Sequence, residues 1–162
     1  MGYDMVRMNE DGDPMEISDL NDDAYFRLNI WGMGRTRQLA LWGAGLASSE
    51  EMLASERKWQ EKYNYEGQNL DFHEAMVRID EEVVQMGRLN EYHADTDDGS
   101  WLEPFCSNWN VATAEQCLAF ANGLRIAQRR IDEAVVKFDV DYEYYWEFAE
   151  WLEASPHGVF VG

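Results

Sequence analysis

The sequence predicts an α+β fold, mostly helical, with four or five helices packed with two or three short strands in a single domain of residues 1–162. Three observations support this class. Long stretches repeat apolar residues every three or four positions, as amphipathic helices do. Short segments near both ends are typical of strands. The chain has 162 residues, of which 46% are hydrophobic, which suffices for one core.

Two strands and an acidic loop are expected before the first helix. Residues 2–8 (GYDMVRM) alternate well enough for a short strand, and residues 25–29 (YFRLN) predict a second strand with alternate side chains on opposite faces. Residues 9–23 hold seven acidic side chains, no basic one, one glycine and one proline. That composition is typical of a solvated loop.

The first helix is expected to begin after Asn29, whose side chain can cap it. One helical face then carries large apolar residues: Trp31, Leu39, Trp42 and Leu46. Several glycines interrupt the same stretch, and each weakens a helix by up to about 1 kcal/mol relative to alanine. Glycine is best tolerated where another backbone packs close, so these positions indicate close packing.

Two helices are expected in the middle of the chain. The first begins at a capping box, Ser48-x-x-Glu51. The second, within residues 69–90, carries a 4-3-4-3 apolar repeat: Phe72, Met76, Ile79, Val83 and Met86. This seam lasts about two heptads, short of the three or four that a coiled coil needs, so we expect it to face the chain's own core. A homodimer through the 72–86 seam is the alternative.

Two further helices and a closing strand are expected in the last third. Thr113-x-x-Gln116 is a second capping box. The helix behind it carries one long apolar face: Cys117, Leu118, Ala121, Leu124, Ile131, Val135 and Phe138. The last helix is expected at residues 141–153 and ends before Ser155-Pro156, after which HGVFVG returns as a strand.

Charge limits the classes of partner. The chain has 32 acidic and 13 basic residues, a formal net charge of −19. Such a field repels nucleic acid and anionic membranes and attracts basic surfaces, although acidity also serves solubility alone. No signal peptide is visible, and no apolar run reaches the roughly 20 residues of a membrane helix. With Cys106 and Cys117 as the only cysteines, we expect reduced thiols and a cytoplasmic location.

Searches for catalytic and metal motifs find none. There is no Glu-x-x-His pair of a di-metal bundle, no HExxH, no GxSxG and no phosphate loop. Residues 95–103 (DTDDGSWLE) miss the register of a calcium loop. The histidines His73, His93 and His157 are expected at helix ends and surfaces. We therefore predict no catalytic residue, no metal and no cofactor. The missing motifs favour a protein without enzymatic activity.

The segment at residues 25–37 (YFRLNIWGMGRTR) is a candidate anion-binding site. In this segment a predicted strand leads directly into the N-terminus of a predicted helix. The free N–H groups and the positive end of the helix dipole at that terminus favour anions. Arg27, Arg35 and Arg37 would add positive charge, and Trp31 or Tyr25 would stack on a base. In the alternative interpretation, the glycines only permit close packing and the arginines pair with the acidic loop just upstream.

The second candidate site is a row of acidic residues in the last helix and just before it: Asp139, Glu143, Glu147 and Glu150. Apolar and aromatic residues cover about 220° of this helix at 100° per residue. The helix is therefore sandwiched in the core or meets a partner. Four charges over about 16 Å approach the roughly 3.4 Å axial phosphate spacing of one DNA strand. The alternative is an ordinary solvated helix face.

Several fragments spread over most of the chain resemble a family of uncharacterised proteins of actinobacteria and their phages. These are GYDM, YFRLNIWGMG, PFCSN, a W…WLE tail and HGVFV. In that family an Asp-Gly-Trp-like turn usually follows SN, whereas this chain has SNWNV. The resemblance implies a cytosolic, phage-borne protein. The family has no assigned activity, so no functional residue is carried over.

Two functions follow as hypotheses. The first is a phage-encoded, non-enzymatic binding protein whose acidic row and 9–23 loop steer a basic host protein of the nucleic-acid-binding or defence type. It would act as an inhibitor, with DNA mimicry as one form. The second is a binder of a small anionic ligand or nucleotide, which uses the arginine segment near Asn108 and Trp109. Salt separates them, because a steered acidic interface weakens sharply as salt rises.

Overall fold

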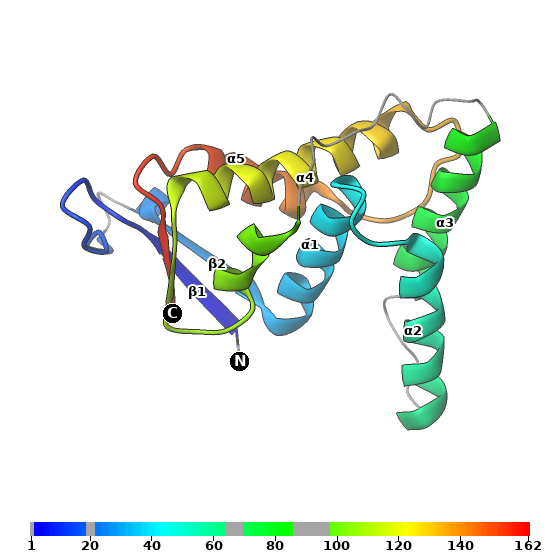
Figure 1. Ribbon diagram of the computed structural model, residues 1–162, viewed down its shortest axis with the longest axis horizontal. Helices are drawn as coiled ribbons and strands as arrows, with labels where there is room; N and C mark the ends of the chain where they lie inside the picture. The colour runs from blue at the N-terminus through cyan, green and yellow to red at the C-terminus, as the bar shows by residue number, and fades with distance from the viewer. Residues whose placement is uncertain (1, 19–21, 64–69, 86–97) are drawn as a thin grey trace.

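A computed structural model describes residues 2–18, 22–63, 70–85 and 98–162. The strands are β1 (Gly2–Arg7), β2 (Tyr25–Asn29), β3 (Asn110–Ala112) and β4 (Val159–Val161). The α-helices are α1 (Ile30–Gly43), α2 (Ser49–Tyr63), α3 (Leu70–Gln85), α4 (Ala114–Glu133) and α5 (Glu143–Glu153). Short 3-10 helices cover Asp22–Ala24 (η1) and Ser100–Phe105 (η3). The predicted class, mostly helical α+β, is confirmed (Figure 1).

The strands form one antiparallel sheet in the order β2-β1-β4-β3. The last strand therefore lies between the first strand and β3, and the ends of the chain are side by side (Figure 1). Asp4 and Gly162 exchange backbone hydrogen bonds of 3.2 and 2.7 Å. Strand β3 was not predicted. It is three residues long, too short to show alternation, and it forms because β4 offers it a partner.

Strand β2 runs directly into α1, and the predicted cap is confirmed. The Asn29 side chain accepts a hydrogen bond from the Gly32 backbone N–H at 2.5 Å. Four residues were predicted to share one helical face, but only Leu39 and Trp42 of them are buried. Trp31 is 53% exposed and Leu46 is 38% exposed and lies beyond the helix, whereas Trp42 is buried. Helix α4 approaches α1 near Ala40 and Gly43, in its last turns, so the first turn stays uncovered by it.

Glycines mark the crossing of α1 and α4. A Cβ added at Gly43 would lie 1.9 Å from the carbonyl oxygen of Gly123, and one added at Gly123 would lie 2.5 Å from the Ala40 oxygen. The two backbones therefore touch directly, as the glycine pattern indicated. Gly34, in the same helix, has open space around its Cβ position.

The heptad stripe of α3 faces the chain's own core, as expected. Phe72, Met76, Ile79 and Val83 are all buried in the main apolar cluster, while Met86 lies outside the described residues. A homodimer through this seam would require these side chains to leave the core. Helix α2 pairs with α3, and its C-terminal half extends away from the sheet (Figure 1).

The last two helices complete the core, because α4 packs on both α1 and α5. The capping box of α4 is confirmed: the Thr113 and Gln116 side chains each accept a hydrogen bond from the other residue's backbone N–H. Its predicted apolar face is too long, because the helix ends at Glu133. Leu118 is 54% exposed and Val135, beyond the helix, is 73% exposed. Helix α5 is sandwiched in the core, with Phe148, Ala149 and Leu152 fully buried.

None of the helices in the described ranges is both long enough and apolar enough to cross a membrane.

Candidate functional site

The exposed face of α5 carries the acidic row, with one correction. Glu143, Glu147 and Glu150 are exposed on one side of the helix. Asp139 does not belong to that helix, because α5 begins at Glu143 and Asp139 lies in the irregular segment before it. The helical row therefore spans about 10 Å rather than 16 Å, at a rise of 1.5 Å per residue. We call these three glutamates the α5 acidic face.

The α5 acidic face lacks cationic partners within the described chain. No ion pair joins Glu143, Glu147 or Glu150 to a described residue, whereas Glu153 on the same helix pairs with Arg125 at 2.6 Å. The acidic charge is therefore presented to solvent without a counter-charge from the described residues. Glu147 contributes to the raised pKa of the neighbouring Tyr144 phenol, after the larger effect of its partial burial.

Aromatic packing fixes the opposite side of α5. The Phe148 ring lies 5.1 Å from Phe26 of β2 and 5.4 Å from Phe120 of α4. At the start of the helix the rings of Tyr142 and Trp146 stack at 5.8 Å. Burial raises the pKa of Tyr142 to about 12, which reflects a site that excludes water. The glutamates therefore project from a helix that has little freedom to roll.

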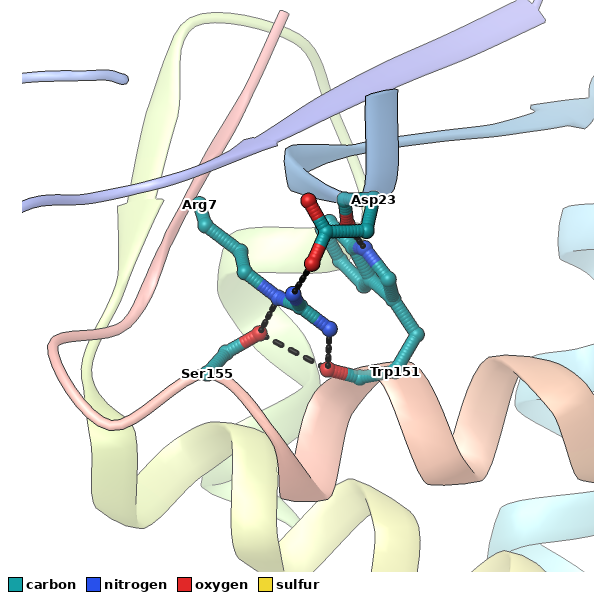
Figure 2. Close-up of polar contacts among 4 residues, drawn as sticks. All are labelled: Arg7, Asp23, Trp151 and Ser155. Atoms are coloured by element: carbon teal, nitrogen blue, oxygen red, sulfur yellow. Dashed lines mark hydrogen bonds and ion pairs between the residues drawn. The ribbon is translucent and has the colours of Figure 1, made fainter. Parts of the chain in front are cut away.

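A polar cluster holds the C-terminal end of α5 against β1 (Figure 2). The Arg7 guanidinium donates to the Ser155 hydroxyl at 3.2 Å, to the Trp151 carbonyl at 3.3 Å and to the Asp23 carboxylate at 3.4 Å. The Trp151 indole N–H donates to the Asp23 carbonyl at 2.7 Å. The side chain of Arg7 is only 15% exposed, and its guanidinium is engaged in these contacts within the molecule. This cluster positions α5 and is not a ligand site.

The four residues proposed for anion binding do not form one group. Arg27 is on β2 and pairs with Asp4 of β1 at 3.6 Å. Arg37 points toward η3, where it donates to the Phe105 carbonyl at 2.8 Å. Trp31 and Arg35 alone line a common hollow, of about 380 Å³. The four residues therefore lie in three different places. The alternative prediction, pairing with the upstream acidic loop, does not describe these contacts of Arg27 and Arg37 either.

The hollow at the start of α1 has mixed chemistry. Besides Trp31 and Arg35, its lining includes Asn29, Asp141 and Tyr144. The Asn29 oxygen already accepts the Gly32 N–H, and the Asp141 carboxylate accepts the Glu143 N–H at 3.0 Å. A carboxylate in the wall opposes an anion that Arg35 would attract. The residues present therefore do not select for an anionic ligand.

A partly buried polar cluster joins four helices, and sequence patterns gave no signal for it. The Asp80 carboxylate of α3 accepts from the Trp42 indole N–H at 2.8 Å and from the Ser49 hydroxyl at 2.5 Å. Arg130 of α4 lies 3.7 Å from the same carboxylate and donates to the Trp42 carbonyl at 3.2 Å. Its members are far apart in the sequence, so only the packing brings them together. Its role is structural.

The histidines and Cys117 have environments that differ from one another in burial. His73 lies in the first turn of α3, as a position at a helix end predicts, but the expected exposure is wrong: it is buried, with Nε2 3.0 Å from the Gln38 amide oxygen. His157 is exposed, and His93 lies outside the described residues, as does part of the calcium-like segment. Burial raises the pKa of the Cys117 thiol to about 12, so that thiol is not a nucleophile at neutral pH. In the described ranges no group of three or more metal-ligating side chains assembles.

Comparison with protein-family models, with curated proteins and with solved structures gives no significant match to this chain. The resemblance to actinobacterial and phage proteins therefore stays a prediction.

Proposed function

We propose that this protein is a non-enzymatic binding protein whose acidic surface takes a basic protein partner. The observation that carries the proposal is the α5 acidic face: exposed carboxylates without described counter-ions, on a helix whose other side is locked into an aromatic core. The helix that carries these carboxylates is preorganised, so a partner would not have to order its backbone. Ordering costs otherwise reduce the affinity of an interface.

The distribution of positive charge strengthens this argument. Only 13 basic residues oppose 32 acidic ones. Among the basic residues, Arg130 is buried, Arg7 is nearly buried, and Arg37 donates a hydrogen bond to a backbone carbonyl. Arginines that act inside the molecule contribute less to its surface potential. The field outside is therefore strongly negative, and a basic partner would associate faster than diffusion alone allows.

The partner class follows from the same field. A basic host protein of the nucleic-acid-binding or defence type fits best, and the protein would inhibit it by covering its basic surface. DNA mimicry is one form of this inhibition. It is favoured by three fixed carboxylates within about 10 Å, although that row is shorter than the sequence suggested. A captured partner that duplex DNA displaces would be consistent with mimicry.

Charge reversal on α5 tests the proposal. Glu143→Lys/Glu147→Lys is expected to weaken capture of a basic protein from an actinobacterial lysate by at least about tenfold, because steering and rim contacts are lost. High salt should release the same protein from the wild-type chain. The readout is the amount of captured protein at low and high salt, by gel and mass spectrometry.

The matched control is Glu61→Lys/Asp132→Lys, which changes exposed acids on α2 and α4. Both double variants raise the formal charge by 4, from −19 to −15. Equal loss of capture in the two variants would mean that overall charge matters and the α5 acidic face does not. Unchanged capture by the α5 variant would remove α5 from the function.

A small-ligand function has one observation in its favour: Trp31 and Arg35 line a hollow of ligand size. If this were the function, ATP would bind in calorimetry and binding would persist at high salt, because a desolvated hollow is little screened. Trp31→Ala would then abolish it and Trp59→Ala, on α2, would not. Because the Asp141 carboxylate lies in the wall of this hollow and repels phosphate, we expect no ATP binding.

A further inference from the structure

One face of the sheet is separate from the core. Along the strands Met5, Leu28, Val159 and Val161 are fully buried against the helices. Alternate side chains point the other way, and the strand register aligns them in a row across the sheet: Tyr25, Val6, Phe160 and Val111. None of these four belongs to the apolar core or packs against it. Val111 is 53% exposed.

Trp109 stands beside this row and is 82% exposed. Its ring meets the edge of Phe160 at 6.0 Å. Its backbone has φ of 67°, the left-handed region that residues other than glycine rarely adopt. The backbone N–H donates to the Val161 carbonyl at 2.7 Å, which holds the strained conformation. We call Tyr25, Val6, Phe160, Val111 and Trp109 the open sheet face.

Trp109 is strained in its backbone and exposed in its side chain, so burial of the ring does not offset the strain. Glycine at this position would relieve the backbone and lose little buried area. Backbone outliers kept by a structure cluster at functional sites. Exposed apolar patches with a tryptophan are typical of interaction surfaces, where tryptophan is over-represented among the residues that dominate binding. The open sheet face therefore has the properties of an anchor for a partner.

Charge selects the occupant of this face. A second copy would bring a charge of −19 against −19, and nucleic acid and anionic lipid are repelled for the same reason. The surroundings carry more acids than bases: Glu103 lines a hollow next to Val111, and exposed acids of the loop after β1 follow the far end of the sheet, while Arg27 on the same face is paired with Asp4. The bare ring of Trp109 can bind a guanidinium or ammonium group through its π face. A basic protein is the occupant that these features match.

We propose that the open sheet face is the anchoring surface for the basic partner, and that it takes an extended segment with apolar and arginine side chains at alternate positions. This inference rests on the proposed function, in which the α5 acidic face supplies steering. A strand-like segment has a side-chain period of two, so its apolar side chains would lie on Trp109, Phe160 and Val111. Its arginines would point away from the sheet, where the net charge of −19 of the whole chain attracts them.

Two synthetic peptides test this surface directly. One is an octapeptide of alternating arginine and leucine, and the other alternates arginine and glycine, so their charges are equal. Wild-type protein is expected to bind the leucine peptide at least about tenfold more tightly at low salt, from the contact of apolar side chains with the open sheet face. Binding of both peptides should weaken at high salt. Calorimetric titration gives the dissociation constants.

Trp109→Gly is the decisive variant. It is expected to weaken binding of the leucine peptide about 30-fold, as loss of a dominant tryptophan does, and to make the two peptides nearly equal. Glycine adopts the left-handed backbone without strain, so the Tm should stay within about 3 °C of wild type. Unfolding then cannot explain the loss. The control is Trp59→Ala, which removes a half-exposed tryptophan of α2 and should leave the leucine preference unchanged.

The outcomes separate the two proposals. Equal binding of the two peptides by wild type, or a leucine preference that survives in Trp109→Gly, would overturn the open sheet face as an anchor. In either case, salt-sensitive binding of both peptides would leave the proposed function standing. If neither peptide binds at low salt, the attraction to basic partners itself fails, and the anchoring surface fails with it.

Discussion

Gly43→Ala is expected to destabilise the protein by about 3 kcal/mol, because overpacking a tight core contact costs about that much when backbone has to move. The new methyl group would lie 1.9 Å from the Gly123 carbonyl oxygen and 2.9 Å from the Ala127 nitrogen. Both are backbone atoms of α4, so no side chain can rotate away. Helices α1 and α4 would have to separate, and the core between them would loosen.

The measurement is thermal or urea unfolding of Gly43→Ala beside Gly34→Ala. The control makes the same chemical change in the same helix, but its Cβ meets nothing within 4 Å. Alanine there should stabilise the helix by up to about 1 kcal/mol. The two variants are therefore expected to move the Tm in opposite directions, with Gly43→Ala lower than wild type by about 10 °C. Similar shifts in both would show that the crossing is looser than described.

Asp80→Ala is expected to cost about 2–3 kcal/mol, because buried donors lose their acceptor, although the Asp80 side chain itself is 33% exposed. Arg130 is 8% exposed and would keep a charge without this carboxylate beside it. The Trp42 indole N–H and the Ser49 hydroxyl would lose their acceptor as well. These groups come from α1, α2 and α4, so the loss would reach most of the helical layer.

Glu81→Ala is the matched control for this variant. Glu81 is the next residue on α3 and pairs with Arg78 at 3.8 Å, with both side chains more than half exposed. Exposed pairs of this kind contribute under about 1 kcal/mol. The double variant Asp80→Ala/Arg130→Met should recover part of the stability lost in Asp80→Ala, because it also removes the buried charge of Arg130. A loss no larger than that of Glu81→Ala would mean that the cluster is not needed for folding.

Neither stability site belongs to the α5 acidic face or to the open sheet face. Their variants should change binding only through the folded fraction. Conversely, Trp109→Gly and the α5 reversal should change binding while the core stays intact. This separation allows stability and function to be measured on different variants of one chain.

Local and additive properties of this protein could be predicted from the sequence. The Asn29 cap and the Thr113–Gln116 capping box depend on residues within three positions of each other, and both are formed. The apolar stripe of α3 follows from the helical period and is buried. Net charge is a sum over residues, so the expectation that nucleic acid is not a partner rests on composition alone and stays a prediction.

Which side chains meet was decided by the tertiary structure. Trp31 and Trp42 lie on nearly the same side of α1, yet only Trp42 is buried, because α4 touches the last turns of that helix. Arg27, Arg35 and Arg37 are close in sequence but point to a neighbouring strand, a hollow and η3. Sequence proximity places residues on an element. It does not set where another element crosses it, and burial and pairing depend on that crossing.

The candidate site shows the same division. The sequence by itself determined that this is an acidic, mostly helical protein with a row of glutamates on its last helix, since periodicity and charge are local or additive. Only the tertiary structure decided that Asp139 lies outside that helix, that β4 inserts between β1 and β3, and that Trp109 is held out in solvent. Each depends on backbone segments distant in sequence, whose pairing is chosen by the packing of the whole chain.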